Sequence, residues 1–340
     1  MKPHLLVLLS AFVLGAAPPP PPGPSAPASS AAEDSAAPDA RTLDFGADQS
    51  QRMTVPVNVA GTGPYSFVVD TGAERTVIAR ELAVRLALDQ GGKVKVDSMT
   101  EISDIATAII PALEVGGNQL RGIHAPELDR RNLGAEGMLG IDALQSERVS
   151  FDFKRRLMTI VPSRRIEERW DGDAIVVVGK RIYGQLVLID ASVDGQKVWV
   201  IIDTGAQISV GNLALRRQLE RRHRLPETHP VQMLSITGGH MIADATLIKS
   251  IRLGGVNIQN LPIAFADVHP FRKMQLMDRP AILLGMDALR LFDRVSVDFA
   301  NRRVRLLPGS HAQWQPENHL ALVRRARAKA ARTHPSVSLA

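Results

Sequence analysis

The stretch Ser66–Ala73 reads SFVVDTGA, and the stretch Trp199–Ala206 reads WVIIDTGA. An apolar run that ends in Asp-Thr-Gly-Ala therefore occurs twice in one chain, which indicates an internal repeat. A single Asp-Thr-Gly is weak evidence of function, because Asp and Gly are common in turns that end strands. Two copies in the same apolar context are much more specific.

Further blocks recur in the same order after each Asp-Thr-Gly, with wider spacing in the second copy. Extra residues between conserved blocks are typical of loop insertions. The chain is therefore predicted to consist of two related halves. The recurring blocks are Leu113–Gly117 with Ile251–Gly255, Met138–Leu144 with Leu283–Leu289, and Val149–Phe153 with Val295–Phe299.

The pattern around these blocks is typical of a mainly β protein, since short β-branched runs alternate with Gly, Asp and Asn from Asp44 onward. The chain has 340 residues, of which 45% are hydrophobic and 4% aromatic, so two aliphatic cores are possible. Each copy is expected to begin with a hairpin and to carry one short helix after the Asp-Thr-Gly. The expected hairpin turns are Gly61-Thr62-Gly63 and Asp194-Gly195, and the expected helices span Arg80–Leu88 and Asn212–Arg222.

Asp70 and Asp203 are the candidate catalytic residues. Two carboxylates that meet at a two-fold or pseudo-two-fold axis cannot both ionise easily, because like charges at close range raise one of the two pKa values. The ionised carboxylate can then take a proton from a water held between them, while the protonated one polarises a substrate carbonyl. This arrangement would give hydrolysis without a covalent intermediate.

The residues beside each aspartate are expected to support the pair. The amide N–H groups of Gly72 and Gly205 can donate to the carboxylates, and glycine permits close backbone approach. The hydroxyls of Thr71 and Thr204 can bond backbone groups of the opposite copy and so join the two loops.

These motifs resemble the retropepsin-like aspartic proteases, over about Asp44 to Pro308. The resemblance implies two small β lobes with an active-site cleft between them and crossed loops in each lobe. It also implies that the turns at Gly140 and Gly285 pack beneath the active-site strands. Viral members assemble from two identical chains, whereas this chain carries both half-sites, so a monomer with two lobes is expected.

Ala73 and Ala206 stand where pepsin-like enzymes usually carry serine, and the viral enzymes are more similar at this position. A serine hydroxyl bonded to the carboxylate would favour the ionised form and lower its pKa. Without it, we expect the working pH to be less acidic than that of pepsin-like enzymes.

A flap is expected to cover the cleft. The candidate in the second copy is the glycine-containing hairpin tip at Thr237, Gly238 and Gly239. The corresponding stretch of the first copy, Val96–Ile102, lacks glycine, so the second lobe alone provides the flap if the lobes are unequal. An ordinary surface hairpin is the alternative for both. The pepsin flap tyrosine has no counterpart here, since Tyr65 and Tyr183 lie elsewhere.

The ends of the chain indicate export. Residues 1–28 are interpreted as a signal peptide, because the apolar run Leu5–Ala17 follows a lysine and is too short for a stable membrane anchor. Cleavage is expected after Ala17 or Ala28. We expect a disordered linker at 29–43, lobes at 44–163 and 174–308, and a basic tail at 309–340. After removal of the signal we expect no membrane span. The expected location is periplasmic or secreted.

Other functional classes have less support. The chain has no cysteine, and its nine histidines form no H-x-x-x-H pair, so we expect no metal site and no cofactor. Ser209 lacks a G-x-S-x-G context and is expected to cap a helix. Much of the formal charge of +6 lies in the tail, and we expect no nucleic acid as a partner. The predicted function is an aspartic endopeptidase acting on peptides or proteins; the alternative is a non-catalytic module of the same fold for peptide binding or assembly.

Overall fold

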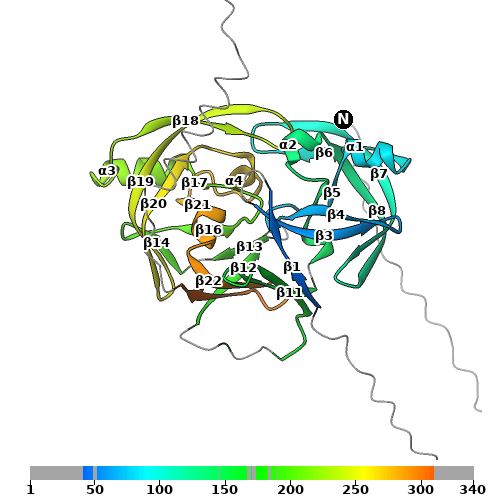
Figure 1. Ribbon diagram of the computed structural model, residues 1–340. Helices are drawn as coiled ribbons and strands as arrows, with labels where there is room; N and C mark the ends of the chain where they lie inside the picture. The colour runs from blue at the N-terminus through cyan, green and yellow to red at the C-terminus, as the bar shows by residue number, and fades with distance from the viewer. Residues whose placement is uncertain are drawn as a thin grey trace, which may run out of the picture. The chain divides into compact units, whose positions relative to one another are not determined.

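The computed structural model describes residues 41–48, 52–144, 146–166, 170, 174–182, 185–188 and 190–309. This part of the chain is mainly β (Figure 1). The expected signal peptide and the tail from residue 310 lie outside it. Strand β1 (Arg41–Asp44) already pairs with β11 (Leu157–Pro162), so the linker predicted for 29–43 ends earlier than expected.

The first lobe is built around a closed ring of strands. Strand β3 pairs with both β4 and β7, which closes the order β3-β4-β9-β5-β8-β7, while β2 and β6 extend it. The strands of this lobe are β2 (Gly46–Ala47), β3 (Met53–Val59), β4 (Thr62–Val69), β5 (Val77–Ala79), β6 (Asp89–Asp97), β7 (Ile102–Val115), β8 (Asn118–Leu128) and β9 (Gly137–Leu139).

The second lobe repeats this order, with two short strands, β13 and β14, in the place of β3. Strand β13 pairs with β16, and β14 pairs with β15 and β19. The repeat seen in the sequence is thus a repeat of topology. The strands of this lobe are β13 (Gln185–Leu188), β14 (Ala191–Val193), β15 (Gln196–Lys197), β16 (Trp199–Ile202), β17 (Ser209–Gly211), β18 (His229–Leu234), β19 (His240–Leu253), β20 (Val256–Phe265) and β21 (Ala281–Leu284).

A sheet shared by the two copies runs in the order β1-β11-β10-β22-β23-β12. Its central pair is β10 (Glu147–Asp152) with β22 (Phe292–Asp298), the last recurring block of each copy, and Ser150 lies opposite Ser296. Strands β23 (Arg303–Pro308) and β12 (Ile175–Ile182) complete it. The lobes are therefore joined by a continuous hydrogen-bonded ladder.

The two hairpin turns have the backbone that two-residue loops require. Ala60 and Gly61 have φ of 50° and 76°, and Asp194 and Gly195 have φ of 45° and 76°. Positive φ at both positions matches the right-handed twist of the flanking strands. The second turn lies where it was predicted. The first lies one residue earlier, because Thr62 already belongs to β4.

Short helices connect the strands. The predicted helix of the second copy is α3 (Leu213–Arg221), whose N-cap Asn212 accepts a hydrogen bond from the Leu215 amide at 2.9 Å. Ser209 does not cap it, because this serine lies in strand β17. The predicted helix of the first copy is shorter than expected. The remaining helices are α1 (Arg80–Arg85), α2 (Arg130–Leu133), the 3₁₀ helix η1 (Ile141–Ala143), α4 (His269–Lys273) and α5 (Met286–Leu289).

The cores consist mainly of aliphatic side chains. One cluster runs through both lobes and the shared sheet, where Val149 and Phe151 of β10 pack with Val295 and Val297 of β22. A second cluster lies in the second lobe around Phe271. These cores hold rigid the strands that carry the two Asp-Thr-Gly loops.

Candidate active site

Asp70 and Asp203 each follow the buried end of a strand. Strand β4 runs parallel to β9, and the Asp70 amide donates to the Leu139 carbonyl at 3.0 Å. In the same way β16 runs parallel to β21, and the Asp203 amide donates to the Leu284 carbonyl at 3.0 Å. The predicted turns after Leu139 and Leu284 therefore position the aspartates directly.

Gly140 and Gly285 have a steric role at these turns. A Cβ atom on Gly140 would lie 2.4 Å from the backbone carbon of Arg75, and one on Gly285 would lie 2.8 Å from that of Ile208. The Asp-Thr-Gly loops thus pass directly over the two glycines, and no larger residue fits there.

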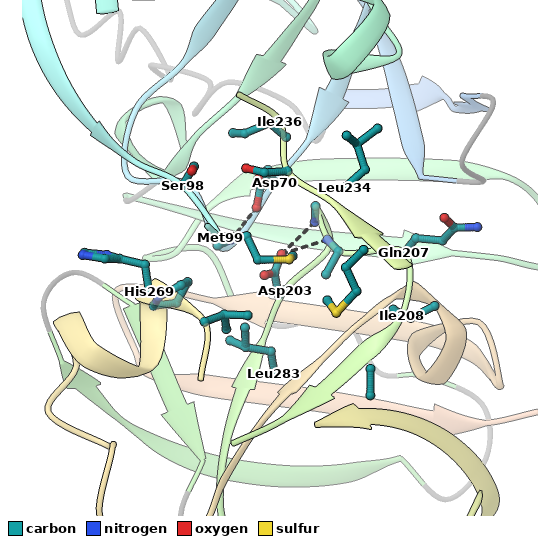
Figure 2. Close-up of a pocket in the computed structure, with 18 of the residues that line it drawn as sticks. Asp70, Ser98, Met99, Asp203, Gln207, Ile208, Leu234, Ile236, His269 and Leu283 are labelled. Carbon is teal, nitrogen blue, oxygen red and sulfur yellow. Dashed lines mark hydrogen bonds between the residues drawn. The ribbon is translucent and has the colours of Figure 1, made fainter. Parts of the chain in front are cut away.

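The two carboxyl groups face each other, and each lies against the glycine of the opposite Asp-Thr-Gly loop. Oδ1 of Asp70 accepts the amides of Gly72 at 2.7 Å and Ala73 at 3.0 Å, and Oδ1 of Asp203 accepts those of Gly205 and Ala206, both at 3.0 Å. Each carboxyl is therefore fixed by two backbone donors. Figure 2 shows the pair in the middle of the cleft.

Gly72 and Gly205 leave space for the opposite aspartate. A Cβ atom on Gly205 would lie 2.2 Å from Oδ2 of Asp70, and one on Gly72 would lie 2.8 Å from the carboxyl carbon of Asp203. Any side chain at either position would separate the carboxyls or push them out of line.

Thr71 and Thr204 join the two loops, as the sequence predicted. The Thr71 hydroxyl donates to the Ile202 carbonyl at 2.9 Å and accepts the Thr204 amide at 3.1 Å. The Thr204 hydroxyl donates to the Val69 carbonyl at 2.7 Å and accepts the Thr71 amide at 2.9 Å. Both threonines are buried, so these four bonds are shielded from water.

The two aspartates differ in their electrostatic surroundings. Burial and then the negative charge of Asp70 raise the pKa of Asp203 to about 8. Burial also raises the pKa of Asp70, but the Gly72 amide and the charge of Arg52 oppose this effect. At neutral pH one proton is therefore shared, and it belongs mainly to Asp203.

A second pair of aspartates supports the loops from behind. Asp142 accepts the Thr76 amide at 2.9 Å and the Thr76 hydroxyl at 2.8 Å. Asp287 accepts the Ser209 amide at 2.9 Å and hydroxyl at 2.7 Å. Burial raises the pKa of Asp287 to about 6. The predicted helix cap Ser209 is thus a support of the active-site loop, and it also accepts the Gly285 amide at 3.1 Å.

Both lobes, and not the second alone, extend a hairpin over the cleft. The tip between β18 and β19 contains the predicted residues Thr237, Gly238 and Gly239, and Gly238 has φ of 92°. The tip between β6 and β7 closes with a bond from the Ser98 amide to the Glu101 carbonyl at 2.9 Å. This turn uses no positive φ, so its lack of glycine did not exclude a hairpin. The tips meet, because the Thr237 hydroxyl donates to that of Ser98 at 3.0 Å.

The cleft beneath these hairpins has a volume of about 1780 Å³. Its walls are mostly apolar. Figure 2 shows Met99 beside the two aspartates, His269 on one side, and Gln207 and Ile208 on the other. The apolar lining residues of the hairpin tips and strands include Met99, Met138, Met233, Leu234, Ile236, Ile263 and Leu283.

Two features of the site were missed from the sequence. Arg52 is buried, lines the cleft and pairs with Asp48 at 2.6 Å. Helix α4 places His269 and Lys273 in the cleft wall. Neither feature belongs to a recurring block, so the repeat gave no indication of it.

Among the described residues, no group of three or more His, Cys, Asp or Glu side chains gathers as metal ligands would.

Two β lobes whose Asp-Thr-Gly loops meet across a cleft define the architecture of the aspartic proteases. A family model described as Aspartyl protease matches residues 55–143 and again residues 189–288. These matches cover more than half of the chain, and the chain therefore belongs to this family, with one family unit in each lobe. A comparison with curated proteins finds no significant match.

Proposed function

We propose that the protein is an aspartic endopeptidase that hydrolyses peptide bonds with a water activated between Asp70 and Asp203. The observation that carries this proposal is the pair of buried carboxyls that the two loops hold face to face, with the pKa of both raised by burial. A module that only bound peptides would gain nothing from two buried carboxyls that repel each other.

The unequal surroundings assign different roles to the two groups. The ionised Asp70 takes a proton from the water, whose oxygen attacks the carbonyl carbon of the scissile bond. The protonated Asp203 donates a hydrogen bond and then its proton to the carbonyl oxygen. The resulting tetrahedral diol collapses when Asp70 passes the proton it took from the water to the amide nitrogen and Asp203 takes back a proton from a hydroxyl of the diol. The C–N bond then breaks, the amine leaves, and no covalent bond to the protein forms.

The cleft supports a peptide substrate. Its volume of about 1780 Å³ is well above that of a pocket for one small molecule, and it runs beneath both hairpins. The apolar walls favour apolar side chains near the scissile bond.

No helix in the described part of the chain has the length and apolar character of a membrane span.

The test is cleavage of a mixed peptide library by the wild type, Asp70→Asn and Asp203→Asn. Both substitutions keep the size of the side chain but prevent the sharing of a proton, so we expect each to reduce cleavage at least a thousandfold, as about 4 kcal/mol of transition-state stabilisation would require. The matched control is Asp278→Asn, an exposed aspartate outside the cleft, which should keep full activity. Cleavage that survives in either dyad variant, or a wild type that binds peptides but never cleaves them, would refute the proposal.

We further propose that the protein acts outside the cytoplasm, on the basis of the apolar run Leu5–Ala17. Expression of the full chain in a bacterium, followed by fractionation and N-terminal sequencing, tests this. A mature chain in the periplasm or medium that begins after Ala17 or Ala28 supports it, whereas an uncleaved cytoplasmic chain contradicts it.

A further inference from the structure

Two equivalent positions of the repeat differ in charge. Arg75 is the fifth residue after Asp70, and Ile208 is the fifth after Asp203. Both line the cleft, and the backbone of each passes over the equivalent glycine, Gly140 or Gly285. Because the two copies are related by an approximate two-fold axis through the dyad, the positions lie on opposite sides of the scissile bond. One offers a cation and the other an aliphatic side chain.

The neighbouring positions also carry a charge in the first copy and none in the second. Glu74 and Asp97 line the cleft on the side of the first lobe, and their equivalents Gln207 and Leu234 are uncharged. Figure 2 shows Gln207, Ile208 and Leu234 on one side of the dyad. The two halves of the cleft therefore have similar backbones but different charge.

The acidic residues near Arg75 are partly compensated by a lysine from the opposite lobe. Lys273 of helix α4 lies 2.9 Å from Glu74 and 3.8 Å from Asp97, and His269 lies 3.9 Å from Asp97. Lys273 thus offsets part of the repulsion that an acidic substrate side chain in this half would meet from Glu74 and Asp97.

Arg75 is the cation that remains available. Lys95, which also lines the cleft, pairs with Asp104 at 3.1 Å. Arg52 pairs with Asp48 at 2.6 Å. Within the described ranges no ion pair involves Arg75, and its side chain is exposed. A guanidinium in this state binds a carboxylate through two parallel hydrogen bonds.

We propose that the cleft is directional: the half around Arg75 binds an acidic side chain of the substrate, and the equivalent half around Ile208 binds an aliphatic one. The preferred substrate then carries Asp or Glu on one side of the scissile bond and an aliphatic residue at the matching distance on the other. This inference rests on the proposed peptidase function. Different side chains on a nearly symmetric backbone would thereby distinguish the two directions in which an extended peptide could lie.

The experiment uses peptides with one fixed apolar scissile pair. A single position is varied in turn along both sides as Glu, Gln, Lys or Leu. For the wild type we expect Glu to exceed its isostere Gln about fivefold in kcat/KM at one position on one side only, the size expected of a partly exposed ion pair. Arg75→Gln should abolish this ratio, and Arg75→Glu should transfer the preference to Lys.

The control is Arg217→Glu, which makes the same charge change on the exposed face of α3 and should leave the Glu-to-Gln ratio unchanged. Equal rates for Glu and Gln at every position, or a ratio that persists in Arg75→Glu, would overturn the inference. Binding of the same peptides to Asp203→Asn, measured by fluorescence anisotropy, separates the two proposals. If no peptide is cleaved but Glu is still bound more tightly than Gln in an Arg75-dependent manner, the proposed catalysis fails and the directional cleft stands.

Discussion

At the scale of the residue, the Thr204 hydroxyl holds the two halves of the site together. It donates to the Val69 carbonyl at 2.7 Å and accepts the Thr71 amide at 2.9 Å, both from the other lobe. Thr204→Ala leaves a buried carbonyl and a buried amide without partners, so we expect a loss of about 2 to 4 kcal/mol in the free energy of unfolding. Thr204→Ser keeps the hydroxyl and should lose less than about 1 kcal/mol. Urea unfolding measures both, and equal losses would contradict the role of the hydroxyl.

The pKa of Asp203 sets the alkaline limit of activity. Catalysis needs this carboxyl protonated, and its pKa is raised to about 8, so kcat/KM should fall as the pH rises through about 8. The unfolded chain releases this proton near the ordinary value of 3.8, whereas the folded chain keeps it to about 8, so the contribution of Asp203 to stability decreases as the pH rises between these values. Asp203→Asn should therefore flatten the pH dependence of unfolding over this range. Activity confined to strong acid would contradict the assignment.

The sequence predicted the meeting of Asp70 and Asp203, because both end an apolar strand in equivalent copies. It did not predict the contact between Ser209 and Asp287, since a serine before a helix is more often a cap. Nor did it predict the pairing of Arg52 with Asp48 beside the dyad, which has no equivalent in the repeat. A recurring motif could be found from the sequence, whereas side-chain contacts that depend on how the loops pack could not.

At the scale of the element, the two hairpin tips interlock above the cleft. A Cβ atom on Gly239 would lie 2.2 Å from the hydroxyl oxygen of Thr100 in the other tip. Gly239→Ala should therefore force the hairpins apart, and we expect kcat/KM to fall about tenfold, through KM rather than through kcat. Thr100→Ala in the same chain removes the clashing oxygen and should restore most of the activity. Wild-type kinetics in Gly239→Ala would show that these hairpins do not cover the substrate.

The hairpins also show the limits of reading elements from composition. A glycine marked the tip of the second lobe, because Gly238 adopts a positive φ. The tip of the first lobe closes through Ser98 and Glu101 without one. Turns of this kind carry no strong residue signature, so only the second hairpin was recognised as a flap candidate.

At the scale of the whole molecule, the ladder between β10 and β22 connects the two lobes. The sequence showed these two segments as the last block of the repeat, but it could not show that they pair with each other. Such a contact joins residues that are far apart in the chain, and its register depends on how the lobes pack. Arg294 adds ion pairs to Asp152 across this ladder at 2.9 Å.

This shared sheet predicts that the lobes unfold together. Phe151 is fully buried in the cluster that runs through both lobes, and Phe271 is fully buried in the separate cluster of the second lobe. Phe151→Ala and Phe271→Ala should each cost about 3 to 5 kcal/mol. Hydrogen exchange should show the amides of β4 and β16 losing the same amount of protection in both variants, because a single cooperative unit opens as a whole. If Phe271→Ala exposes only the second lobe, the two lobes are independent folding units and the ladder joins them without coupling them.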